Sequence, residues 1–310
     1  MGSKCFDIIT IGYIFNENIL FPETKAGPFL GGTVSYSSVV LGRLGDSVGI
    51  VSNIGTDMPY LLLKPIYDSG VDTAGLHIRG DSHTTTNILI YDKDGNKKIN
   101  YIYKAPRIVN EDIPSDYLNC QIVFFCPVDF DVSPETVAHI KGKGLITAAD
   151  MGGFGGAHSS AELQEQFLQN RTENLKAYTQ NIDIAKASME DCRHLFGEDG
   201  FSEEEALQKL IDTGIKIAII TMGEKGAVIA TKEGCTRIPP IQVNVVDTTG
   251  AGDTFMAAFL SEYIKTKDLY ISGLFASATS SILIERSGGV NTDRIPNREQ
   301  VLKRQEFYYK

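Results

Sequence analysis

The sequence has few of the residues from which disulfide and metal sites are built. Its five cysteines are odd in number and scattered, and no Cys-x-x-Cys pair occurs. Its five histidines are equally scattered, without the spacing of metal ligands. Neither a disulfide framework nor a zinc site is therefore indicated, and we expect reduced thiols in the cytoplasm.

Long apolar runs are also missing, so no transmembrane helix is expected. Lys4 and Asp7 follow closely on the first residue, which is unlike the apolar stretch of a signal peptide. The formal net charge is −10. This charge argues against nucleic acid and anionic membranes as partners, and any phosphate site must be built from local groups.

Two widespread phosphate-transfer motifs are absent. No Gly-x-x-x-x-Gly-Lys-Ser/Thr loop occurs, and no catalytic loop of the eukaryotic protein-kinase type is visible. P-loop nucleotidases and protein kinases of that type are thus excluded.

The most informative stretch that is present is residues 247–255, Asp-Thr-Thr-Gly-Ala-Gly-Asp-Thr-Phe. It places a glycine-rich turn before an amphipathic helix, whose apolar stripe is Phe255, Met256, Phe259, Leu260, Tyr263 and Ile264. A helix start carries unpaired N–H groups and partial positive charge, and glycines let a phosphate approach that backbone. The stretch predicts an anion cradle beside a potential base, Asp253, which is the equipment of phosphoryl transfer to a hydroxyl.

The alternative interpretation is an ordinary strand, turn and helix, with glycine chosen only for a tight turn. Ile241, Val243, Val245 and Val246 precede the turn and predict the strand. Asp253 would then be a capping carboxylate at the start of the helix.

Residues 247–255 resemble the C-terminal signature of the ribokinase-like (PfkB) carbohydrate kinases. Residues 31–45, which begin Gly-Gly-Thr and end Arg-Leu-Gly, resemble the early signature of the same family. Residues 221–226, Thr-Met-Gly-Glu-Lys-Gly, resemble its nucleotide loop. With the three motifs in order, the resemblance covers essentially all 310 residues.

The fold predicted from the alternation of strand and helix signals is α/β, with a mostly parallel sheet between helices. The resemblance implies the ribokinase-like three-layer α/β/α form as a single kinase domain, residues 1–310. Strands are expected at residues 6–11, 48–54, 122–126, 145–149, 182–185 and 217–221. Helices are expected at residues 34–44, 58–68, 134–141, 161–178 and 202–212, and after residues 253, 269 and near 298.

One region breaks this alternation. Residues 84–104 alternate apolar and polar side chains around the turn 92–96, Asp-Lys-Asp-Gly-Asn, which predicts a hairpin. Residues 16–30 are expected to pair with it. The resemblance implies a small β lid from about residues 14–30 and 84–108, which covers the substrate and offers a surface for a homodimer. The alternative is a solvent-facing hairpin without a role.

The resemblance also implies roles at the phosphate end of the site. Gly250, Ala251 and Gly252 would offer N–H groups to the transferred phosphate, and Asp253 would be the general base. Asp247 and Thr249 match positions that hold a monovalent cation such as K⁺ in some members, although they could simply cap the turn. The nucleotide would be contacted by Thr221, Gly223 and Gly226, which could instead form only a tight turn between strands.

At the acceptor end, Gly31 and Gly32 would let a sugar or polyol pack against the backbone. Glu17 stands where the family usually carries a shorter acid that binds hydroxyls, and Tyr36 replaces a frequent Asn. Tyr103 would reach the substrate from the lid, or lie on the surface.

The metal position departs from the family pattern as well. The family's Asn-x-x-Glu, which organises Mg²⁺ and phosphates, aligns with Ser188 and Asp191, each a shorter version. Asp191 could still act on Mg²⁺ through water, because that ion keeps several waters in proteins. The glycine-rich residues 150–156 follow a strand and are expected to line the cleft.

The activity implied by the resemblance is ATP- and Mg²⁺-dependent phosphorylation of a hydroxyl on a small sugar or polyol. Nucleosides are an alternative acceptor, with Tyr13, Phe15 and Tyr36 as residues that could stack on a base. Inositol is another, and a vitamin kinase of the pyridoxal type is less favoured. A relative that binds ligand without catalysis is a further alternative, motivated by Ser188 and Asp191.

Overall fold

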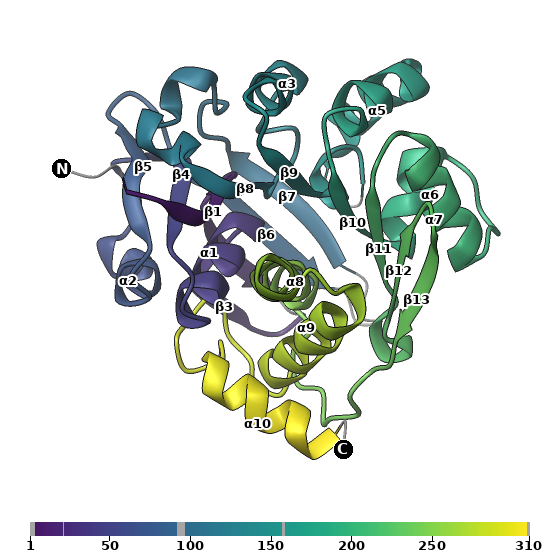
Figure 1. Cartoon of the computed structure of the whole chain (residues 1–310). Helices are drawn as coiled ribbons and strands as arrows, with labels where there is room; N and C mark the ends of the chain where they lie inside the picture. Colours follow the sequence, from purple (N-terminus) through teal and green to yellow (C-terminus); the bar gives the residue numbers. More distant parts are fainter. Residues whose placement is uncertain (1–3, 21, 92–96, 157–158, 309–310) are drawn as a thin grey trace.

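The computed structural model describes residues 4–20, 22–91, 97–156 and 159–308 and contains a nine-stranded sheet (Figure 1). The strand order is β13-β12-β11-β10-β9-β8-β1-β4-β5, parallel from β11 to β5 and antiparallel at β12 and β13. The strands are β1 Phe6–Ile11, β4 Val48–Gly55, β5 Asp72–Arg79, β8 Cys120–Phe125, β9 Ile146–Asp150, β10 Ile184–Ser188, β11 Ile217–Thr221, β12 Ala227–Thr231 and β13 Gly234–Ile238.

Helices cover both faces of this sheet, as Figure 1 shows. One face carries α1 Thr33–Arg43, α2 Tyr60–Asp68, α8 Ala251–Thr266, α9 Leu269–Leu283 and α10 Arg298–Tyr308. The other carries α3 Pro134–Gly142, α4 Ala161–Gln169, α5 Arg171–Thr179, α6 Met189–Phe196 and α7 Glu203–Asp212. Each layer has its own apolar core against the sheet, because a parallel sheet must be buried on both faces. The predicted α/β fold class is confirmed.

A second sheet of four strands stands apart from the main one, in the order β3-β2-β6-β7. Its strands are β2 Phe15–Leu20, β3 Lys25–Gly31, β6 Thr85–Tyr91 and β7 Lys97–Tyr103. β2 and β6 pair in parallel, and the chain enters this sheet twice, after β1 and after β5. These strands fall in the two ranges expected to form a lid, while the turn at residues 92–96 lies outside the described residues. Short 3₁₀ turns complete the chain at Asn110–Asp112 (η1), Ser115–Leu118 (η2), Met151–Gly153 (η3) and Gly223–Lys225 (η4).

Two predicted elements differ in the structure. The strand expected at residues 241–246 is a loop, in which Val245 is 55% exposed. Pro239 and Pro240 precede it, and proline offers no N–H to a strand ladder. The single helix expected at residues 161–178 is two helices, α4 and α5, which meet at Asn170 with φ −133°. Asparagine favours such boundaries because its side chain competes for backbone hydrogen bonds.

Candidate active site

A cavity of about 700 Å³ opens where the parallel strands β10 and β11 end, the edge at which α/β sheets bind ligands. Its lining comes from distant parts of the chain. The small sheet contributes Phe15, Glu17, Asn87, Leu89, Ile99 and Tyr101. Helix α1 adds Thr33 and Tyr36, and the turn before α8 adds residues 248–253. Another part of the wall is formed by residues 240–243 and 245 and by serines of α9, and the ends of β10 and β11 with the residues that follow them add to the lining.

The glycine-rich turn lies where the sequence predicted, directly before a long helix. Gly250 caps α8 with φ 78°, a left-handed conformation that favours glycine. A Cβ there would also stand 2.4 Å from the ring of Tyr36. The N–H of Ala251 donates to the Thr248 carbonyl at 3.0 Å, so this amide closes the turn. The N–H groups of Gly252 and Asp253 follow in the first helical turn, where amides lack partners within the helix.

Lys186 is a site residue that the motifs did not reveal. It lies on β10, is 5% exposed and lines the cavity. Its ammonium donates to Asp150 at 2.9 Å, and a Cβ on Gly252 would approach its Nζ to 2.7 Å. Burial by itself would lower the pKa of Lys186, but Asp150, Asp191 and Asp253 together raise that pKa above its usual value. The Lys186 ammonium thus lies against the glycine-rich turn that precedes α8.

The glycine-rich residues 150–156 were expected to line the cleft, and this prediction is wrong for the described structure. The segment packs inward instead: a Cβ on Gly153 would lie 2.0 Å from the Pro127 carbonyl oxygen. Its first residue, Asp150, nevertheless serves the site by holding Lys186.

Asp253 is the third residue of α8, half-buried, and lines the same cavity as Lys186 and Glu17. Asp253 lies at the N-terminal end of α8, where the partial positive charge of a helix stabilises a carboxylate. A substrate hydroxyl in this cavity can therefore meet a carboxylate, an ammonium and helix-start amides together.

Ser188 and Asp191 form a capping box at the start of α6. The Asp191 carboxylate accepts from the Ser188 N–H at 2.7 Å and hydroxyl at 2.8 Å, and the Ser188 hydroxyl accepts from the Asp191 N–H at 3.0 Å. Both line the cavity beside Glu190. Among the described residues no group of three or more His, Cys, Asp or Glu could hold a metal ion alone.

The predicted nucleotide loop joins β11 to β12. Thr221, Gly223 and Gly226 all line the cavity. Both glycines have positive φ, 58° and 84°, and a Cβ on Gly226 would lie 2.2 Å from the Ile238 carbonyl oxygen. The loop is thus a tight turn between strands, as the alternative interpretation had it, and its residues also face the cavity.

Glu17, expected to bind the acceptor, lines the cavity from the small sheet. Glu17 is 7% exposed, and its carboxylate accepts from the Asn87 amide at 3.0 Å. Gly31 does not line the cavity; a Cβ there would lie 3.1 Å from the Glu17 side chain, so this glycine makes room for Glu17. Gly32, with φ 92°, does line it.

The tyrosines divide between the cavity and other positions. Tyr103 is 46% exposed and stacks on His83 at 4.1 Å between ring centroids, so its predicted contact with substrate is not supported. Tyr101 lines the cavity instead. Tyr13 is buried, with its hydroxyl donating to the Ala105 carbonyl at 2.7 Å.

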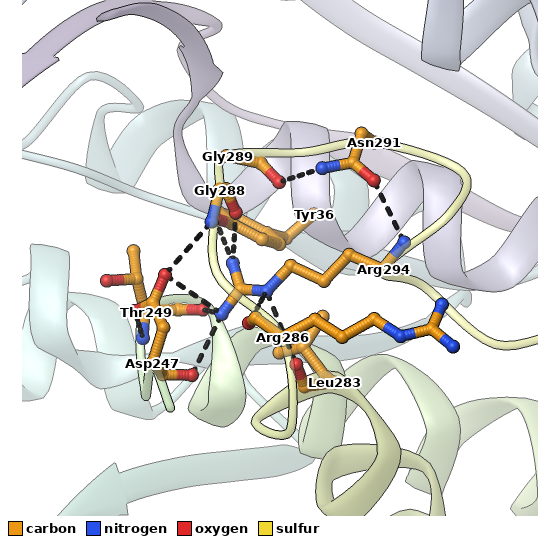
Figure 2. Close-up of polar contacts among 9 residues, drawn as sticks. All are labelled: Tyr36, Asp247, Thr249, Leu283, Arg286, Gly288, Gly289, Asn291 and Arg294. Carbon is orange, nitrogen blue, oxygen red and sulfur yellow. Dashed lines mark hydrogen bonds and ion pairs between the residues drawn. The ribbon is translucent and has the colours of Figure 1, made fainter. Parts of the chain in front are cut away.

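Tyr36 is held between the glycine-rich turn before α8 and Arg294 (Figure 2). Its hydroxyl accepts a hydrogen bond from Arg294 at 3.1 Å. Arg294 also reaches Asp247 and Thr249, the two residues matched to a cation position. Asp247 caps the turn as well, because its carboxylate accepts from the Thr249 N–H at 2.9 Å.

Comparison with known proteins identifies the family of this chain. The model of the pfkB family of carbohydrate kinases matches residues 2–296. A nucleoside kinase of Methanocaldococcus jannaschii is 26% identical over 99% of both chains. Fructokinase-1 of Zea mays is 25% identical, covering 88% of this chain and 87% of its own. The structure of a putative ribokinase II from E. coli, in complex with ATP and Mg²⁺, superimposes with a TM-score of 0.81 over 98% of this chain and 100% of the other, at 18% identity.

The chain therefore belongs to the pfkB family of carbohydrate kinases and has the ribokinase-like fold. It is an ATP-dependent kinase that acts on a small molecule with an alcohol group as acceptor. No helix among the described residues is long and apolar enough to span a bilayer.

Proposed function

We propose that the chain transfers the terminal phosphate of ATP to a hydroxyl of a small sugar or polyol held between the small sheet and the turn at residues 248–252. The observation that carries this proposal is the single cavity shared by Glu17, Lys186 and Asp253. The nucleotide would lie along the loop after β11, and the acceptor against Glu17 and Gly32. Asp253, on the first turn of α8, lines the same cavity as both sets of residues.

The catalytic roles follow from the charges of these groups. Asp253 would orient the hydroxyl and take its proton late, which a weak base can do in a loose phosphoryl-transfer transition state. The amides at Gly252 and Asp253, with Lys186, would stabilise the charge on the transferred phosphate. The small sheet would exclude water and so suppress wasteful hydrolysis.

Mg²⁺ fits the site only as a companion of ATP. This ion binds one or two carboxylates together with substrate phosphates, and Glu190 and Asp191 offer carboxylates on the nucleotide side. Because the Asp191 carboxylate already accepts from Ser188, we assign it a contact through water. When bound, the ion neutralises charge on the phosphates.

A nucleoside is the second candidate acceptor. Phe15 and Tyr101 both line the cavity, with ring centroids 6.1 Å apart and planes at 88°. Such rings can hold a nucleobase by stacking. Tyr13 and Tyr36 are held by other contacts, so this alternative rests on Phe15 and Tyr101.

The test is ADP release from Mg-ATP against a panel of sugars, polyols including inositol, and nucleosides. Asp253→Asn should lower acceptor-dependent turnover by about 10²–10⁴-fold, with little change in ATP affinity. Asp268→Asn is the matched control, because Asp268 is likewise a carboxylate at the start of a helix, where it accepts from the Ile271 N–H of α9, but it lies outside the cavity lining. Ligand-induced stabilisation without turnover would show a binding protein, and undiminished turnover in Asp253→Asn would remove the base.

Two further proposals concern the setting of the enzyme. A cytoplasmic location is supported by the five free cysteines.

A homodimer through the small sheet is supported by the exposed apolar Ile102, which lies beside Tyr103 on β7, the edge strand of that sheet. Sedimentation of the wild type and of Ile102→Lys measures that association.

A further inference from the structure

Arg294 is a buried arginine in the loop between α9 and α10, far along the chain from the phosphate turn. It is 1% exposed, and its guanidinium is surrounded by oxygen atoms (Figure 2). Burying a charged group costs free energy unless hydrogen bonds and an opposite charge compensate it. The acceptors of this guanidinium therefore show how its burial is tolerated.

Six oxygen atoms accept hydrogen bonds from the guanidinium, and five are backbone carbonyls. Nε donates to the backbone carbonyl of Leu283 at 3.3 Å and to that of Arg286 at 2.9 Å. One terminal nitrogen donates to the Gly288 carbonyl at 2.5 Å and the Tyr36 hydroxyl at 3.1 Å. The other donates to the carbonyls of Asp247 and Thr249, both at 2.9 Å. The Asp247 carboxylate adds an ion pair at 3.4 Å, so all five N–H donors of arginine have acceptors.

This oxygen cage has the composition of a monovalent cation site. Converging carbonyl oxygens replace the hydration shell of K⁺ in proteins, and one carboxylate supplies the opposite charge. Leu283 is the last residue of α9, where the helix dipole adds negative potential. Asp247 and Thr249 are the residues that the sequence matched to such a cation. In this chain, however, their oxygens face Arg294, and the guanidinium occupies the centre of the cage.

We propose that the Arg294 guanidinium is a built-in replacement for a monovalent cation, and that this kinase works without K⁺. The positive charge holds the Asp247 and Thr249 carbonyls in place. Because a peptide unit is planar and trans, fixing the Thr249 carbonyl on Arg294 aims the Gly250 N–H in the opposite direction. Arg294 is thus a positioning residue for the phosphate turn. The claim that turnover is independent of K⁺ rests on the proposed function. The claim that the guanidinium fills the cation position does not.

The first arm uses the wild-type protein, with KCl varied against choline chloride at constant ionic strength and ADP measured directly by chromatography. We expect less than about a twofold change in turnover, and no change in melting temperature. Thallium-205 NMR should show no saturable Tl⁺ site. Activation by K⁺ of about fivefold or more, or a saturable Tl⁺ site lost in Arg294→Ala, would overturn the inference.

The second arm opens the cage with Arg294→Ala. In choline, turnover should fall about 10²-fold or more because the turn loses its support, and the melting temperature should fall. K⁺ or guanidinium should restore much of both, raising the melting temperature by about 2–6 °C and binding to the folded variant. Arg237→Ala is the control, because it removes an arginine from an exposed ion pair with Glu204 and should show no such response.

A folded Arg294→Ala that responds to neither K⁺ nor guanidinium would contradict the proposal. If that variant does not fold, Arg294→Lys retains a cation in the cage, and the wild-type arm decides by itself. The melting and Tl⁺ measurements need no acceptor, so they decide the cation question even if no kinase turnover is found.

Discussion

Replacing Lys186 with methionine tests whether its charge acts on the phosphate or only on Asp150. Methionine keeps the length of the side chain but removes the ammonium. Among the described residues, the Asp150 carboxylate, 1% exposed, would then keep only the Gly152 N–H, at 3.1 Å. Breaking a buried ion pair costs about 3–5 kcal/mol. At about 2 °C for each kcal/mol in a chain of this size, the melting temperature should fall by ~6–10 °C.

Turnover should fall independently of that loss of stability. Removing one preorganised donor to a developing oxyanion typically costs about 10²–10³-fold in turnover. The double variant Lys186→Met/Asp150→Asn separates the two effects, because a neutral amide needs no counter-charge. We expect the second substitution to recover most of the melting temperature and little of the turnover.

The assay is acceptor-dependent ADP release at a temperature well below every melting midpoint, with Asp150→Asn alone completing the cycle. Recovery of turnover to near the wild-type value in the double variant would refute the reasoning. Lys186 would then serve only to neutralise Asp150.

Two further substitutions test the acceptor end and the phosphate turn. Glu17→Ala should raise KM for the acceptor by about 10- to 100-fold, which corresponds to the free energy of one hydrogen bond to a charged group. Equal changes in KM for the acceptor and KM for ATP would show that Glu17 does not belong to the acceptor site. Gly250→Ala should destabilise by about 1–2 kcal/mol from its φ of 78°, plus about 1–3 kcal/mol from the collision with Tyr36, as measured by urea unfolding. Gly70→Ala is its control, because φ is 73° there and nothing lies within 4 Å, so equal losses in both variants would show that the ring collision is unimportant.

The features that the sequence predicted well are those written in neighbouring residues. Alternating strand and helix signals gave the layered fold, and the run at residues 247–255 located the turn and the start of α8. A turn and the helix after it depend on local conformational preferences and on the spacing of apolar residues, both of which are visible in one short window.

Other site features depend on contacts that no short window contains. Arg294 reaches Thr249 and Tyr36 from a distant loop, so nothing near it in sequence marks it. Lys186 had one signal, a lone charge within the apolar strand β10, which is rarely a chance event in a buried strand. The position of Tyr103, which the sequence left open between substrate and surface, depends on a bulge that shifts the β6–β7 register between Thr86 and Asn87.

The cavity has an unbalanced set of charges. Among the described residues, five acidic ones line it, against Lys186 as the one cation: Glu17, Glu190, Asp191, Glu224 and Asp253. A polyanion that enters such a space meets net repulsion, and the low dielectric of a partly enclosed site strengthens it. A nucleotide that carries a bound divalent cation meets less of this repulsion, because the cation offsets part of the negative charge of the phosphates. Uncomplexed ATP should therefore compete weakly with Mg-ATP, and added salt should speed nucleotide association by screening the repulsion rather than slow it.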